Sequence, residues 1–162
     1  ALADRDDIHF VFAGFGAKRK WLEGAASAMT NVTLLERQPR ARLNDLLTAC
    51  DVSVVSLAGG MSGVSVPSRM YNVLASGRPM LAMAAPDSEP AAIIAEGGVG
   101  WRVGPGDVAA LVSTIAAAAA NPRLVAEMGA RARRAAEEKY SLASIGERYR
   151  ALVREVVAGR PR

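Results

Sequence analysis

Residues 51–84 read DVSVVSLAGGMSGVSVPSRMYNVLASGRPMLAMA, and this stretch decides the fold. Its two ends, residues 51–57 and 79–84, predict β-strands. Between them, a loop of small residues leads to Pro67, which favours a helix start, and Gly77 favours the end of that helix. Because strand, helix and strand follow one another through short loops, the stretch predicts a βαβ unit with parallel strands.

The same alternation continues in both directions along the chain. On the N-terminal side we expect a buried strand at residues 8–13, a helix at 17–29, a strand at 32–35 and a helix that begins at Pro39. On the C-terminal side we expect a helix at residues 88–96, a strand at 99–103, and three closing helices at 107–120, 122–139 and 141–158. The prediction is an α/β, Rossmann-like fold, with a parallel β-sheet, helices on both faces and two or three helices at the end.

Composition excludes several classes of protein. The 162 residues are 51% hydrophobic and 22% charged, which fits a single globular domain over 1–162 rather than a disordered tail or a coiled coil. Cys50 is the only cysteine, which excludes a disulfide framework and fits a reducing compartment. We expect a cytoplasmic domain, and the longest apolar stretch is too short to span a bilayer.

The net charge of +4 is concentrated near the C-terminal end. Residues 122–162 carry ten Lys and Arg against five Asp and Glu, so the basic excess belongs to the last quarter. A nucleic-acid-binding domain would add stacking aromatics or a recognisable motif, and we expect no nucleic-acid partner. The basic tail leaves two alternatives open, a solvated helix face and peripheral association with the inner face of an anionic membrane.

Three loops are candidate binding sites because they follow strands of a parallel sheet, whose ligands bind at the carboxyl ends of the strands. They cover residues 14–18, 37–40 and 58–69. In the first loop, Gly14-Phe15-Gly16 enters a helix, so the turn suits either a phosphate at the helix N-terminus or tight geometry alone. Arg19 stands where the dinucleotide-binding fingerprint has its third glycine, which disfavours an NAD-binding domain.

The third loop carries the more informative pattern. Ser62-Gly63-Val64-Ser65-Val66-Pro67-Ser68-Arg69 is a small-residue loop that enters a helix with an arginine in its first turn. Free N–H groups, the Ser68 hydroxyl and the Arg69 guanidinium together suit a diphosphate. The alternative is a proline-started helix that Ser68 caps, with Arg69 as a solvated residue.

Several other residues favour structural roles, and no catalytic constellation or set of metal ligands emerges from the sequence. We expect His9 to serve a strand, Cys50 to be a buried filler, and Met80 and Met83 to belong to the core. The alanine run at residues 116–120 indicates a helix packed closely on a neighbour. The cluster of Arg131, Arg133 and Arg134 is typical of a solvated helix face.

Taken in order, the segments resemble the C-terminal, donor-binding domain of GT-B glycosyltransferases of the GT4-like type that build bacterial polysaccharides. Residues 66–82, VPSRMYNVLASGRPMLA, carry most of this resemblance and are similar to the family block "vPSK…E.mA.G.PVla". Residues 31–34 with 46–52, residues 99–107, and Tyr140-Ser141 resemble further blocks in the same order. The resemblance runs over nearly the whole chain.

The resemblance implies a role for each candidate residue. The loop and helix start around Gly63, Ser68 and Arg69 would hold the diphosphate of a nucleotide-sugar such as a UDP- or GDP-sugar. Arg37-Gln38-Pro39 would lie beside the nucleobase, and Gly14-Phe15-Gly16 would border the donor pocket. Many relatives hold the sugar and the ribose with an E-x7-E pair, and this chain departs from it. Asn72 stands at the second glutamate, and Val64, or Met61 with a longer loop, stands at the first.

The resemblance also sets expectations for the whole protein. It implies a glycosyltransferase that transfers a sugar from the nucleotide-sugar to a glycan or lipid-linked acceptor, with no cofactor and no metal site. It implies that residues 1–162 are a fragment, inactive alone, which lacks an acceptor-binding N-terminal domain and the first strand and helix of the donor domain. Two alternatives remain, a sugar-nucleotide epimerase of similar architecture and a non-catalytic nucleotide-binding module.

Overall fold

The computed structural model describes residues 1–61 and 63–159. Ser62 of the small-residue loop and residues 160–162 of the basic tail lie outside the described residues. In chain order the elements are β1 (Phe10–Ala13), α1 (Arg19–Ala26), β2 (Val32–Leu35), the 3-10 turn η1 (Arg40–Arg42), α2 (Leu43–Thr48), β3 (Ser53–Ser56), α3 (Arg69–Ala75), β4 (Met80–Met83), α4 (Glu89–Gly97), β5 (Gly100–Val103), α5 (Val108–Ala119), α6 (Pro122–Lys139) and α7 (Leu142–Ala158).

The strands are parallel, and they are divided between two sheets. β1 pairs with β2, with Phe10 opposite Val32. The second sheet has the order β3-β4-β5, with Met80 of its central strand opposite Ser53 on one side and Gly100 on the other. The expected α/β fold with parallel strands and helices is confirmed, and the sheet is interrupted between β1 and β3.

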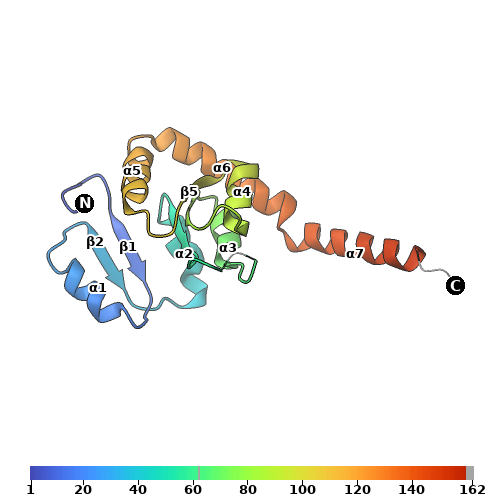
Figure 1. The fold of residues 1–162 in the computed structure, drawn as a ribbon, viewed down its shortest axis with the longest axis horizontal. Helices are drawn as coiled ribbons and strands as arrows, with labels where there is room; N and C mark the ends of the chain where they lie inside the picture. The colour runs from blue at the N-terminus through green and yellow to red at the C-terminus, as the bar shows by residue number, and fades with distance from the viewer. Residues whose placement is uncertain (62, 160–162) are drawn as a thin grey trace.

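The main hydrophobic core lies around the three-stranded sheet. Met70 and Leu74 of α3 and Met80 of β4 are fully buried there, together with residues from α4 and α6. Apolar residues of α3 recur at helical spacing, so one face of the helix enters the core while the other stays exposed. Figure 1 shows α3, α4 and α6 gathered beside this sheet.

Helices α3 and α6 approach closely through a glycine. A Cβ added at Gly129 of α6 would lie 2.4 Å from the carbonyl oxygen of Gly77, directly after α3. Farther along α6, the Arg133 guanidinium donates to the carbonyl of Ala75 at the end of α3, and the Arg131 Nε donates to that of Gly98, which ends α4. The expected solvated face is wrong for Arg131, which is half-buried and bonds to the end of α4. Arg133 is exposed as expected, although it also donates to the C-terminal end of α3.

The last three helices begin where their sequence signals place them. The side chains of Asp107, Asn121 and Ser141 accept hydrogen bonds from backbone N–H groups in the first turns of α5, α6 and α7.

In the alanine run at residues 116–120, only Ala118 is buried, while Ala117 and Ala120 are exposed. The expected close packing of this run on a neighbour therefore holds for one position. Helix α7 extends away from the rest of the molecule (Figure 1), and none of its residues is buried.

No single helix among the described residues is long and apolar enough to cross a membrane. Helices α5 and α6 reach that length and composition only as a pair, and they are bent by 98° at the break between them.

The N-terminal unit of β1, α1 and β2 differs from the rest in burial. The expectation of a buried first strand is wrong, because Val11, Phe12 and Ala13 are exposed and Phe10 is half-buried. His9 donates or accepts a hydrogen bond with the Thr33 hydroxyl, at 2.8 Å between Nε2 and Oγ1, in keeping with a strand-surface role.

The remaining structural expectations concern sulfur-bearing residues. Met80 is buried in the core as expected, and Met83 is half-buried. Cys50 is also half-buried rather than fully enclosed, and its burial raises the pKa of the thiol above its ordinary value.

Candidate functional site

The loops after β1 and β2 lie together, as expected for neighbouring parallel strands. Gly14 takes a positive φ of 130°, and its N–H donates to the Leu35 carbonyl at 3.1 Å. Phe15 is 76% exposed, and the guanidinium carbon of Arg37 lies 5.8 Å from the centre of its ring. The structure therefore brings Gly14-Phe15-Gly16 next to the segment that begins at Arg37, in a cation–π contact.

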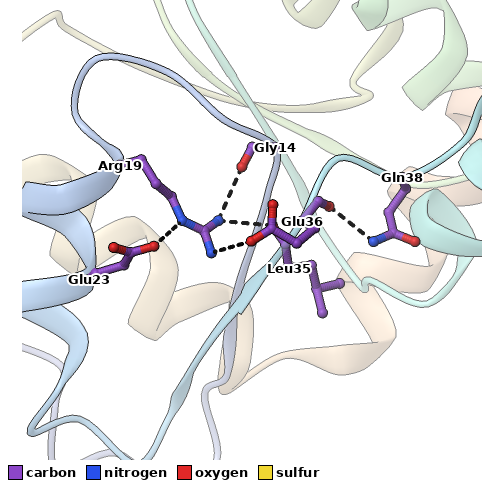
Figure 2. Close-up of polar contacts among 6 residues, drawn as sticks. All are labelled: Gly14, Arg19, Glu23, Leu35, Glu36 and Gln38. Carbon is purple, nitrogen blue, oxygen red and sulfur yellow. Dashed lines mark hydrogen bonds and ion pairs between the residues drawn. The ribbon is translucent and has the colours of Figure 1, made fainter.

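Arg19 clamps the carboxyl ends of these two strands (Figure 2). Its Nη1 donates to the carbonyl oxygens of Gly14 at 3.1 Å and Leu35 at 2.9 Å. Its Nε donates to Glu23 at 2.7 Å, and Nη2 lies 3.5 Å from Glu36. The side chain is only 21% exposed. Arg19 therefore fixes the base of both loops through β-strand carbonyls.

In the sequence, Arg19 is notable only because it replaces the third glycine of the dinucleotide-binding fingerprint. Its hydrogen bonds to the carbonyls of Gly14 and Leu35 were not predicted. Two signals in the sequence point to these bonds. Glu23 follows four residues later on the same helix face, and Glu36 directly follows the apolar run of β2. The tight-turn interpretation of Gly14-Phe15-Gly16 fits this arrangement, with the Arg19 N–H bonded to the Gly16 carbonyl at 3.0 Å.

The nucleobase segment has a simple arrangement after β2. Arg37 and Pro39 are exposed, and Gln38 is half-buried. The Gln38 side-chain amide donates to the Glu36 carbonyl at 3.0 Å, which folds this side chain back over the strand end (Figure 2). The Pro39 carbonyl accepts from the Arg42 N–H at 2.9 Å and opens the short turn before α2, so Pro39 starts a helical segment as expected.

The second group of candidates follows β3 and reaches the start of α3. Gly63 has a positive φ of 73°, and Val64 beside it is strongly exposed. Ser68 occupies the cap position of α3, yet its hydroxyl makes no capping hydrogen bond, so the capping alternative has no contact to support it. The first backbone bonds of the helix are donated by Met70 and Tyr71, to the carbonyls of Pro67 and Ser68. Among the described residues, the N–H groups of Ser68 and Arg69 donate no backbone hydrogen bond, as is usual at a helix start.

Arg69 and Asn72 form the exposed face of α3 near its start. They are three residues apart and therefore neighbours on the helix surface. Within the described part of the chain, the Arg69 guanidinium has no ion-pair partner. The Tyr71 ring contacts that of Tyr140, with 5.2 Å between the ring centroids, and burial raises the pKa of Tyr71. The start of α3 thus offers a cation, a hydroxyl, an amide and two free N–H groups.

The structure assembles the candidates as two half-sites. The first comprises Gly14–Gly16 and Arg37–Pro39, and the second comprises Gly63, Val64, Ser68, Arg69 and Asn72. Among residues 1–61 and 63–159, no hydrogen bond, ion pair or ring contact joins the two groups. The first half-site follows β1 and β2 of one parallel sheet, and the second runs from the loop after β3 of the other sheet into α3.

Comparison with known proteins gives a family match over most of the chain. The model of the family described as "Glycosyl transferases group 1" matches residues 1–121, a range that includes every candidate residue of both half-sites. The chain is 36% identical over 119 residues to the probable glycosyltransferase WbjE of Pseudomonas aeruginosa. The aligned region covers 70% of this chain and 29% of WbjE. The chain thus spans under a third of the length of this curated relative.

Solved structures show the same fold at lower sequence identity. TarM of S. aureus superposes with a TM-score of 0.72 at 22% identity, covering 93% of this chain and 30% of TarM. HepE of Anabaena, crystallised in complex with UDP, gives a TM-score of 0.73 at 15% identity, covering 91% of this chain and 41% of HepE. HepE has also been crystallised in complex with UDP-glucose.

Proposed function

Because the chain belongs to the group 1 family of glycosyl transferases, we propose that its two half-sites bind the nucleotide-sugar donor of a glycosyltransferase. The family match over residues 1–121 carries this proposal, since it spans both half-sites. The complexes of HepE with UDP and UDP-glucose support a nucleoside diphosphate sugar as the donor class. The whole enzyme would transfer the sugar to a glycan or lipid-linked acceptor.

Each half-site suits a different part of such a donor. At the start of α3, the Arg69 guanidinium and the free N–H groups of Ser68 and Arg69 offer charge-assisted hydrogen bonds to a diphosphate. The Asn72 amide, on the same face, offers hydrogen bonds to a ribose hydroxyl. In the other half-site, the exposed Phe15 ring and the backbone of residues 37–39 suit the flat face and the polar edge of a nucleobase.

The chemistry that these residues supply is electrostatic. Transfer of the sugar breaks its bond to the diphosphate, and negative charge develops on the departing oxygen. Arg69 and the N–H groups at the start of α3 would stabilise that charge, and they are already in place before the reaction. Both half-sites would also hold the donor in one orientation toward the acceptor.

The acceptor and the cellular location belong to the same proposal. The acceptor would bind to a part of the protein outside residues 1–162, in a cytoplasmic enzyme that requires no cofactor. The exposed apolar residues of α7 are called its apolar stripe and comprise Leu142, Tyr149, Leu152, Val153, Val156 and Val157. Together with Arg148, Arg150 and Arg154 on the same helix, the stripe is compatible with peripheral contact at the inner face of a membrane.

Calorimetric titration of the chain with UDP, GDP, ADP and NAD tests the donor assignment. We expect one nucleoside diphosphate to bind. Arg69→Ala should raise the Kd for that nucleotide about 10-fold or more, because the variant loses a charge-assisted hydrogen bond. Arg134→Ala is the matched control, because Arg134 is also an exposed helical arginine and lies on α6. Binding of NAD instead, or an equal Kd in both variants, would contradict the assignment.

A further inference from the structure

We infer that Arg19 is a positioning residue for recognition of the nucleobase. It acts through Phe15 and Arg37, the side chains of the first half-site that it holds at a fixed separation, and not by contact with the base. The inference rests on the proposed function and deepens it. It assigns base affinity and base preference in part to a residue that lies outside the three candidate loops.

The first observation is that a single nitrogen atom joins the two loops (Figure 2). Arg19 Nη1 donates to the carbonyl oxygen of Gly14 at 3.1 Å and to that of Leu35 at 2.9 Å. Gly14 directly precedes Phe15, and Leu35 lies two residues before Arg37. A wider separation of the loops would therefore stretch at least one of these two hydrogen bonds.

The second observation is that the guanidinium is itself held in place. Its Nε donates to the Glu23 carboxylate at 2.7 Å, one turn farther along α1, and Nη2 lies 3.5 Å from Glu36. The Arg19 side chain is only 21% exposed. Because the donors of an arginine lie in one rigid plane, little further freedom is lost when the same group bonds to two carbonyls. Arg19 is therefore a fixed spacer between the strand ends.

The groups that Arg19 holds are suited to contact with a base. The Phe15 ring is 76% exposed, so it is open to stacking against a flat heterocycle. The guanidinium carbon of Arg37 lies 5.8 Å from the centre of this ring, which is a cation–π distance. Both side chains belong to loops without regular secondary structure, so their relative placement depends on the strand ends that Arg19 joins.

The effect of Arg19 should be confined to the base portion of the donor. A gap of roughly 0.5–1 Å already removes about a quarter to a half of the attraction between two atoms in contact. A small displacement of Phe15 would therefore weaken stacking on a base. Among the described residues, no hydrogen bond, ion pair or ring contact passes this displacement on to the second half-site, where the diphosphate is proposed to bind.

Calorimetric titration with nucleoside diphosphates and with inorganic pyrophosphate separates the two portions of the donor. We expect Arg19→Met to raise the Kd of the nucleoside diphosphate that binds best about 5-fold or more, as loss of an aromatic contact implies. The Kd of pyrophosphate should change by less than about 2-fold. The preference among UDP, GDP and ADP should narrow. An unchanged preference, or an equal rise of the Kd for nucleotide and pyrophosphate, would overturn the inference.

Lys20→Met is the matched control for this titration. Lys20 is exposed on the same helix and, within the described part of the chain, bonds to neither strand end. We expect the Kd of the nucleoside diphosphate to change by less than about 2-fold in this variant. A rise equal to that in Arg19→Met would assign the effect to the charge of α1 and would overturn the inference.

Amide exchange of the free chain tests the same role without a nucleotide. The Gly14 N–H, bonded to the Leu35 carbonyl, should exchange about 10-fold or more faster in Arg19→Met. The Phe10 N–H, bonded to Asn31 at the other end of β1, should be unchanged and is the internal reference. Equal exchange at Gly14 in the two chains would overturn the inference. Failure of every nucleotide to bind the unmodified chain would contradict the donor assignment instead, so the two failures are distinguishable.

Discussion

Arg19 shows how a single side chain defines one half of the proposed donor site. It bonds to the carbonyls of Gly14 and Leu35, and so it links the bases of the loops that carry Phe15 and Arg37. The two carbonyls lie at the ends of different strands, and without the guanidinium their second lone pairs would depend on water. The Arg19 guanidinium therefore reinforces the backbone bond from Gly14 to Leu35 in holding the two loops together.

Replacing Arg19 measures the strength of this clamp. We expect Arg19→Met to lower the free energy of unfolding measurably, because it removes the hydrogen bonds of a charged donor to the carbonyls of Gly14 and Leu35. Urea unfolding followed by circular dichroism gives the value. Lys20→Met is the matched control, because Lys20 is exposed on the same helix, and it should change stability by less than about 0.5 kcal/mol. Equal losses in both variants would show that the clamp contributes nothing.

The role of a residue could be predicted where neighbouring residues in the sequence indicate it. The role could not be predicted where the residue acts through partners that are distant in the sequence. Ser68 and Arg69 stand out in the sequence because a proline and small residues mark the start of their helix. Arg19 was missed, and Arg131 was assigned to a solvated face, because their partners are carbonyls that only the folded chain brings near. Sequence spacing shows a charged side chain's neighbours on its own helix, but not the strand or helix end that it meets.

At the scale of elements, the packing of α3 on α6 holds the second half-site against the core. The contact needs a residue without a side chain at Gly129, since a Cβ there would meet the Gly77 carbonyl oxygen at 2.4 Å. The same contact fixes the end of α3 whose start carries Ser68 and Arg69. Close approach of two helices thus sets the orientation of the proposed diphosphate-binding groups.

Two glycine-to-alanine variants separate helix propensity from packing. Gly24→Ala in α1 places its Cβ in open space, so we expect a gain of up to about 1 kcal/mol from helix propensity. Gly129→Ala gains the same propensity but drives its Cβ into backbone, so we expect a net loss of about 1–3 kcal/mol. Thermal unfolding of both variants provides the comparison. A stabilised Gly129→Ala variant would contradict the close contact between α3 and α6.

The order and type of the elements followed from the sequence, while the burial of the first strand did not. Helices α5, α6 and α7 begin within a residue or so of the predicted positions because capping side chains mark their starts. Strand β2 has the predicted bounds, and the other strands are shorter than predicted, since the sequence pattern does not mark where strand pairing ends. β1 was predicted to be buried from its apolar run, and burial depends on what packs against a strand as well as on its own residues.

At the scale of the whole molecule, stability is unevenly distributed. The core cluster is formed mainly by residues of β3, β4, α3, α4 and α6, whereas α7 projects outward and has no buried residue. The apolar residues along α7 therefore contribute little to the stability of residues 1–162. The helix is held mainly by its N-terminal cap at Ser141 and by its contacts with α6.

Polar substitutions on α7 test this distribution. We expect Leu152→Ser and Val156→Ser each to change the free energy of unfolding by less than about 0.5 kcal/mol, because both side chains are exposed. Leu74→Ala, at a fully buried position of α3, should cost about 2–5 kcal/mol in the same urea titration. A loss above about 1.5 kcal/mol in either α7 variant would indicate that the stripe is covered in solution.

The placement of the core cluster between Val55 and Ala136 has a consequence for biosynthesis. A ribosome releases β1 and β2 well before Ala136, so the N-terminal sheet emerges while the hydrophobic cluster is still incomplete. During that interval, Phe10, Val11 and Phe12 form an apolar β-strand sequence that the nascent chain leaves uncovered, a natural target for holdase chaperones.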